Sequence, residues 1–185
     1  MAIKGKGKHK NKNRLKELST AQSNMKIKDL MKERKTLRAR DMKPGNLLFT
    51  SYDAKDKEQT YDRTPLVLIL RSGRSHTLGL NFHWIPMSMR INLIKKIISM
   101  NSKNIKKNLP LDFDYHDLKP MLKSLGYAPC IRLYINPRLG KKAVILPPER
   151  LIEAARLKSE SFTNGRYSAT QLYQMARASG KKRRK

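Results

Sequence analysis

Pro65-Leu66-Val67-Leu68-Ile69-Leu70 is the stretch that decides the fold of this 185-residue chain. Five apolar residues in a row follow a proline, and the polar, glycine-containing run 71–75 ends them. A short, continuous apolar run between breakers is typical of a strand that is covered on both faces. We therefore expect residues 66–70 to form a strand with apolar elements packed on either side.

Further strands are predicted on both sides of this one. Residues 46–52 follow a Pro-Gly turn, and residues 76–84 alternate, with Leu78, Leu80 and Trp84 sharing one side. Three successive strands with short connections predict an antiparallel meander, either a small curled sheet or an SH3-like barrel. Residues 130–135 and 142–146 predict two more strands, which we expect to form a hairpin that completes the sheet.

Helical patterns surround these strands, so the predicted fold class is α+β. Apolar spacing predicts helices over 24–40, 88–101, 116–125, 147–157 and 168–178, with Gly126 ending the third and Ser168 capping the last. We expect four parts in the chain. They are a disordered basic arm (1–23), a basic helix and linker (24–43), a single α+β domain (44–178) and a basic tail (179–185).

The charge of the chain is its strongest functional signal. There are 42 Lys and Arg against 14 Asp and Glu, a formal net charge of +28. A protein this cationic repels itself unless an anionic partner lies beside it, and nucleic acid is the abundant cellular polyanion. An anionic membrane surface is the second possibility. No stretch has the length of apolar sequence needed to span a bilayer, and we expect no membrane partner.

The basic residues gather in three places. Residues 1–14 and 180–185 are Lys- and Arg-rich ends with almost nothing to bury, and Pro86 to Pro110 holds six Lys and Arg and no acid. The last of these is the candidate for a structured phosphate-contacting surface, with a solvated helix face as the alternative. The residues expected to contact phosphate are Lys4, Lys6, Lys8, Lys10, Lys12, Arg14, Arg90, Lys95, Lys96, Lys103, Lys106, Lys107, Lys181, Lys182, Arg183, Arg184 and Lys185.

Catalytic motifs are absent from the sequence. It holds no nucleophile elbow, P-loop or zinc-ligand spacing, so we expect no enzyme, no cofactor and no metal. The lone Cys130 has apolar neighbours and is expected to be a buried hydrophobe. The rings of Tyr52 and Tyr61, with Phe82 and Trp84, offer a base-stacking platform, although core packing is favoured for the last two. An acidic loop (Asp53, Asp56, Glu58, Asp62) leaves a Mg²⁺ nuclease open as an alternative, while the acids near His116 favour turns and helix capping (Asp112, Asp114, Asp117).

Two strings carry a resemblance: Tyr61-Asp62-Arg63-Thr64-Pro65-Leu66 and Gly79-Leu80-Asn81-Phe82-His83-Trp84-Ile85-Pro86, the second followed by a basic helix. Their order resembles that of small virion-associated proteins of tailed bacteriophages, the DNA end protector and head-completion proteins of T4-like phages. The match covers residues 44–100 and extends loosely to 147–149. It implies a phage structural or DNA-handling protein without catalysis. The residues that carry it are expected to serve the fold: Tyr61, Asp62, Pro65, Gly79, Asn81, His83 and Trp84.

The resulting hypothesis is a non-enzymatic phage protein that binds double-stranded DNA, at its ends or as packaged genome, through phosphate contacts. Such a protein would act in the virion or the host cytoplasm. Two alternatives stay open. One is an RNA-binding or ribosome-associated basic protein. The other is a structural head–neck protein whose arms bind acidic surfaces of portal, neck or capsid proteins.

Overall fold

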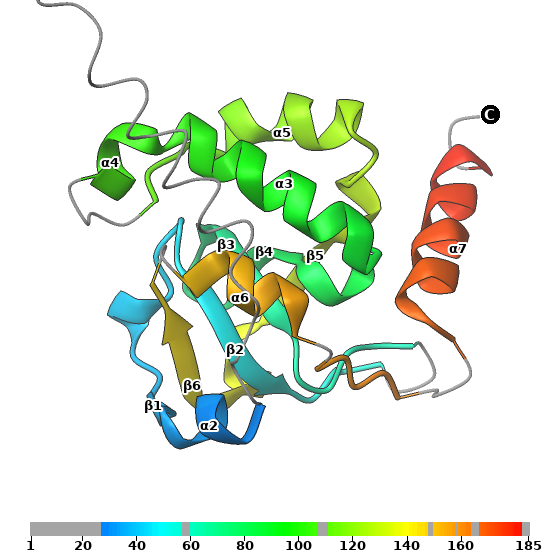
Figure 1. The fold of residues 1–185 in the computed structure, drawn as a ribbon. Helices are drawn as coiled ribbons and strands as arrows, with labels where there is room; N and C mark the ends of the chain where they lie inside the picture. The colour runs from blue at the N-terminus through cyan, green and yellow to red at the C-terminus, as the bar shows by residue number, and fades with distance from the viewer. Residues whose placement is uncertain are drawn as a thin grey trace, which may run out of the picture.

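A six-stranded antiparallel sheet forms the framework of the protein (Figure 1). The computed structural model describes residues 27–56, 60–106, 111–147, 150–157, 159–163 and 167–182. The strand order is β1-β6-β2-β3-β4-β5, so β1 and β5 are the two edges. The strands are β1 (Lys35–Thr36), β2 (Leu47–Tyr52), β3 (Leu66–Ser72), β4 (His76–Asn81), β5 (Ile131–Ile135) and β6 (Leu139–Leu146).

The meander β2-β3-β4 is confirmed, with Leu48 opposite Val67 and Leu68 opposite Leu80. The expected hairpin of the last two strands is wrong, because β5 pairs with β4 and β6 pairs with β2. A three-residue 3₁₀ turn, η4 (Asn136–Arg138), joins β5 to β6 although three strands lie between them in the sheet. The sheet is therefore strongly curled. It is not closed among the described residues, and the SH3-like barrel is not confirmed.

Helices cover one face of the sheet (Figure 1). Leu66, Leu68 and Leu70 of β3 face this layer and join the larger core cluster, which includes Ile94 and Leu118 from two of the helices. The helix α6 also packs directly against α3. The helices on the core side are α3 (Met87–Met100), α4 (Ser102–Lys106), α5 (Tyr115–Ser124), α6 (Leu151–Arg156) and α7 (Ala169–Lys182).

The other face of β3 is covered as well. Val67 and Ile69 belong to a second, smaller apolar cluster that includes Met42 and Tyr134, with Leu37 packed against it. Every residue from Leu66 to Leu70 is at most 2 % exposed. The prediction of a strand buried on both faces is confirmed, and the chain between residues 37 and 42 supplies the second cover.

The long helix expected over residues 24–40 is wrong. A short helix, α2 (Ile27–Lys32), is followed by the edge strand β1, and residues 24–26 lie outside the described part. Leu30 packs into the larger core cluster, whereas Leu37 packs against the smaller one on the opposite face of the sheet. One continuous helix would lie on one face of the sheet, so it could not bring Leu30 to one face and Leu37 to the other. The chain therefore leaves the helix and passes around the edge of the sheet.

The helices α3 and α5 begin and end within one residue of their expected bounds, whereas α6 begins four residues late at Leu151 and α7 extends to Lys182, inside the predicted basic tail. Asp114 caps α5 by accepting the His116 amide at 2.7 Å, and Gly126 follows the helix with a φ of 80°. The Ser168 hydroxyl caps α7 by accepting the backbone amide of Gln171, and the side-chain oxygen of Gln171 accepts the backbone amide of Ser168 at 2.8 Å. None of the described helices combines the length and apolar character that a bilayer-spanning segment requires.

Candidate nucleic-acid interface

A basic cleft lies along the edge strand β1. Arg34, Arg38, Arg40 and Lys142 line a hollow of about 420 Å³, together with Lys35, Thr36 and the single acid Asp41. The carboxylate of Asp41 accepts the backbone amide of Arg38 at 2.9 Å. The buried Nε of Arg34 has no hydrogen-bond partner among the described residues. The cleft therefore concentrates positive charge, with five Lys and Arg against one acid.

Sequence reasoning missed this cleft because it assigned residues 24–40 to one basic helix. Within residues 38–41 only Arg38 has extended backbone angles, and Ala39–Asp41 form a 3₁₀ turn, so no local sequence pattern marks the cleft. Lys142 joins the cleft from β6, since Thr36 pairs with it across the sheet edge. That long-range pairing is not visible in the local sequence.

A second group of exposed cations lies on α3 and α4, as expected. Lys95, Lys96 and Lys103 are exposed, and no acidic residue lies between Pro86 and Lys106. The backbone of Lys106 ends α4, and Lys107 is outside the described residues. We call Lys95, Lys96 and Lys103 the helical patch. It lies on the helical layer, well away from β1 in Figure 1.

Arg90 is not part of this surface, and its assignment as a phosphate contact is wrong. Its side chain is 0 % exposed, because it lies one turn before Ile94 on the face of α3 that packs into the core. Its Nε donates to the carbonyl of Ile85 at 2.7 Å, and Nη2 donates to the carbonyl of His83 and to Glu160. Arg90 therefore joins α3 to two other segments of the chain.

Three of the expected motif residues, Asp62, Asn81 and His83, form a buried polar network beside Arg90. The Asp62 carboxylate lies 2.6 Å from Nδ1 of His83, and Nε2 of the same ring lies 2.9 Å from the Ser159 hydroxyl. A carboxylate only accepts, so Nδ1 carries the proton shared with Asp62. Asn81 donates to the same carboxylate at 3.3 Å and accepts the His83 amide at 2.9 Å.

This network connects three distant parts of the chain. The other oxygen of Asp62 accepts the backbone amides of Thr64 at 3.2 Å and Ser161 at 3.4 Å. These bonds tie Asp62, just before β3, and Asn81, at the end of β4, to the segment 159–163. Phe162 of that segment also pairs with Asp62 in an isolated β-bridge. These bonds are consistent with a structural role for the motif residues.

The order carboxylate, imidazole, hydroxyl is also that of serine hydrolases, but here the His83 ring is 0 % exposed. The Mg²⁺ alternative finds no support in the described geometry. The Asp62 carboxylate points into the network. The Asp53 carboxylate lies 3.4 Å from Nη1 of Arg138, and Glu58 is outside the described residues. No group of three or more His, Cys, Asp or Glu side chains in the described ranges is arranged to hold a metal ion.

Two further motif residues have steric roles. A Cβ on Gly79 would lie 2.2 Å from the Val67 side chain and 3.3 Å from the Tyr134 ring, so the packing of β4 requires glycine. Pro65 is buried and precedes the first residue of β3, where a missing amide is tolerated. These contacts are consistent with a motif that serves the fold.

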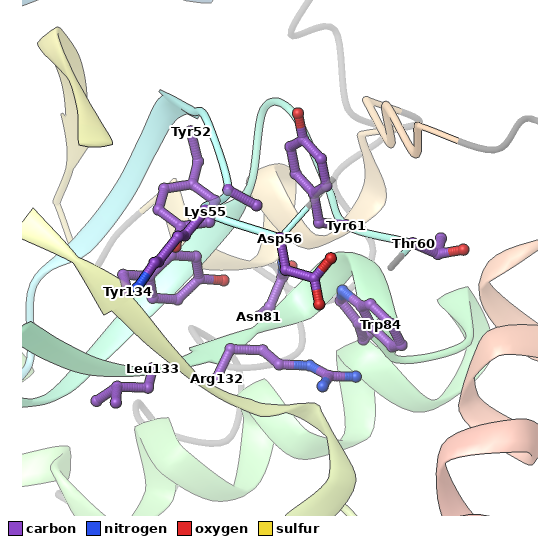
Figure 2. A pocket seen from close by; sticks show the side chains of 11 residues that line it. Tyr52, Lys55, Asp56, Thr60, Tyr61, Asn81, Trp84, Arg132, Leu133 and Tyr134 are labelled. Atoms are coloured by element: carbon purple, nitrogen blue, oxygen red, sulfur yellow. The ribbon is translucent and has the colours of Figure 1, made fainter. Parts of the chain in front are cut away.

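An aromatic pocket of about 290 Å³ shares Asn81 with this network. Figure 2 shows the side chains that line it. The rings of Tyr52 and Tyr134 contact edge to face at 5.0 Å, and Tyr52 contacts Tyr61 in the same way at 6.3 Å. Across the pocket, the Arg132 guanidinium stacks on Trp84, 3.7 Å from its ring centroid. Lys55, Asp56, Thr60 and Asn81 complete the wall.

Cys130 is fully buried, as expected, and burial raises the pKa of its thiol to about 12. Its thiol donates to the Trp84 carbonyl at 3.4 Å. Burial also raises the pKa of Tyr134 well above its usual value and lowers the pKa of Arg132. These groups have ordinary protonation states at neutral pH, and none is a poised nucleophile.

Several predicted phosphate contacts have no described side chain. Lys181 and Lys182 end α7 in the backbone, and their side chains are not described. The rest lie outside the described residues: Lys4, Lys6, Lys8, Lys10, Lys12, Arg14, Arg183, Arg184 and Lys185.

The fold and its surface define a small basic α+β protein with exposed Lys and Arg clusters and a buried, structural polar network. The chain belongs to the family described as the phage T4 terminal DNA protecting protein, whose family model matches residues 3–176. The resemblance found in the sequence, to the DNA end protectors of T4-like phages, is therefore confirmed. No curated protein sequence and no solved structure matches it significantly. The family favours DNA, and it gives no support to RNA, portal, neck or capsid partners.

Proposed function

We propose that this protein binds the ends of double-stranded DNA through phosphate contacts and shields those ends without catalysis of its own. Two observations support this. The family protects DNA termini, and the described surface carries a basic cleft and a helical patch of Lys and Arg. The observation that carries the proposal is the cleft, where five Lys and Arg face one acid whose carboxylate is bound to a backbone amide.

The mechanism is phosphate neutralisation. Lys and Arg side chains displace condensed counterions from the duplex, which supplies affinity without reading base sequence. The basic cleft holds one stretch of backbone and the helical patch holds another. The Lys-rich ends of the chain add further contacts. A bound protein at the terminus then blocks the approach of enzymes that must engage a free end.

An exonuclease protection assay tests the proposal. Linear duplexes of unrelated sequence are mixed with the full chain and then exposed to an exonuclease that degrades DNA from its ends. We expect protection that saturates at a fixed number of protein molecules per end, whatever the sequence. A restriction enzyme that cuts an internal site of the same duplex is the control and should stay active. Degradation at an unchanged rate, with the protein shown to be folded, would contradict the proposal.

A further inference from the structure

We propose that the aromatic pocket lined by Tyr52, Tyr61, Trp84, Arg132 and Tyr134 receives an unpaired nucleobase from the DNA terminus. This inference rests on the proposed function and adds to it. Phosphate contacts are the same at an end and inside a duplex, so they cannot tell one from the other. A base that has left the stack is available at a frayed or extended end, and it is missing from continuous duplex DNA.

Two buried donors in the pocket lack partners. The Nε of Arg132 makes no hydrogen bond with any described residue, and the Tyr134 hydroxyl makes none of normal geometry. A weak contact with the Asn81 side chain only partly offsets the effect of burial on the pKa of Tyr134. Buried polar groups without partners are uncommon, and each favours a ligand that brings an acceptor. Every nucleobase carries carbonyl or ring-nitrogen acceptors on its edge.

The walls of the pocket suit a flat aromatic ligand. Tyr52 and Tyr61 are partly exposed, and Figure 2 shows them on one side of the pocket with the Trp84–Arg132 pair on the other. Bases in single-stranded recognition stack on aromatic rings and on guanidinium planes. The Arg132 plane already stacks on Trp84, so a base placed beside it extends an existing stack.

A base fits the charges of the pocket better than a phosphate does. Asp56 lines the pocket together with Lys55 and Arg132, and Asn81 at its wall donates to the Asp62 carboxylate, so the pocket is of mixed charge and suits an anion less than the basic cleft does. A base is neutral, and its amino groups are donors that a carboxylate accepts. Lys55 at the same wall is placed to meet the phosphate that follows the bound nucleotide.

Trp84 makes the test direct, because it is the only tryptophan among the 185 residues. Its fluorescence therefore reports the pocket alone. The full chain is titrated with a linear duplex that has short single-stranded extensions, and separately with covalently closed circular duplex of the same sequence. Binding is followed independently by retention of labelled DNA. We expect both DNAs to bind, and only the DNA with ends to change the Trp84 emission.

Variants then assign the change to the two donors. Tyr134→Phe removes a hydroxyl that has no regular partner, so the fold should tolerate it, and Arg132→Met removes the guanidinium. Each should lower the preference for ends over circles by about tenfold, the expected order for one lost base contact. Tyr173→Phe and Arg71→Met are matched controls outside the pocket and should keep the preference.

The outcomes separate the two proposals. Failure of both DNAs to bind would overturn the proposed function. Equal binding of ends and circles with unchanged Trp84 emission would overturn the base pocket and leave phosphate binding intact. Loss of end preference in Tyr173→Phe or Arg71→Met as well would also overturn it, since the pocket residues would then have no special part.

Discussion

The interior and the surface of this protein use the same charged residue types in opposite ways. Inside, Arg90 and Asp62 are almost fully buried, and each makes several hydrogen bonds that join separate segments. On the surface, Lys95 and Arg38 have no ion pair among the described residues. A partnered buried charge fixes the fold, whereas an unpartnered exposed charge is available to a polyanion. Net charge alone does not distinguish the two.

The substitution with the largest expected effect is Arg90→Met, which tests whether a buried, partnered charge stabilises the fold. The change leaves Glu160 and two backbone carbonyls without their partner, and removing one member of a buried charged pair costs about 3–5 kcal/mol. We expect the free energy of unfolding, measured by urea denaturation, to fall by that amount. Lys95→Met on the same helix is exposed and should change it by less than about 0.5 kcal/mol. Equal effects of the two would show that Arg90 does not hold the fold.

The converse change removes surface charge. Replacing Arg34, Arg38 and Arg40 together by Gln should weaken DNA binding by about tenfold or more, because each lost phosphate contact reduces counterion release. Retention of labelled duplex measures the affinity, and stability should stay nearly unchanged. Lys119 and Lys123 on α5 are exposed and do not line the cleft, so Lys119→Gln with Lys123→Gln is the control, which removes two positive charges elsewhere against three in the cleft. An equal loss in the control would mean that only total charge matters.

The variant Ser159→Ala tests whether the buried network of Asp62, His83 and Ser159 has a structural or a catalytic role. The Ser159 hydroxyl lies 2.9 Å from His83 Nε2, and its loss should lower the free energy of unfolding by about 1 kcal/mol. Exonuclease protection should stay at the level of the unchanged protein. Ser161→Ala, two residues further on, is the control for stability. If Ser159→Ala abolished protection while the protein stayed folded, the network would have a chemical role that we do not assign to it.

Alkaline pH should lower the free energy of unfolding by a smaller amount, and this loss should be absent near neutral pH. The pKa of Cys130 rises from 9.0 to about 12 on folding, so the thiol loses its proton first in the unfolded chain. Stability from this group is complete below pH 9 and is lost as the pH rises toward 12. Burial of Tyr127, Tyr134 and Tyr173 adds a loss of the same sign at higher pH. Urea denaturation at increasing pH should show this decline, and a flat profile would contradict the burial of these groups.

Local patterns predicted the elements that local physics determines. The apolar run 66–70 and the capping residues Asp114 and Ser168 gave strand and helix positions close to those of the structure. The errors lie where long-range packing decides. The pairing of β5 and β6 depends on sheet curl, and the end of α2 depends on which face of the sheet Leu37 covers.

The candidate site was predicted in part for the same reason. The exposed lysines of the helical patch followed from the absence of acids, but Arg90 is buried although its neighbours in sequence are equally basic. Asp62, His83 and Ser159 lie far apart in the chain, and no spacing rule joins them. The motif strings contain the first two, which were expected to serve the fold. The basic cleft and the base pocket need the folded sheet to bring their residues together.

The salt dependence of DNA binding tests the central claim most directly. The affinity of the full chain for a linear duplex is measured across a range of salt concentrations, and its logarithm is plotted against that of the salt concentration. The account predicts a steep negative slope of about 0.9 per neutralised phosphate, made shallower by the Arg34, Arg38 and Arg40 replacements and unchanged by those of Lys119 and Lys123. A flat response of the unchanged protein would contradict phosphate neutralisation as the way it holds DNA.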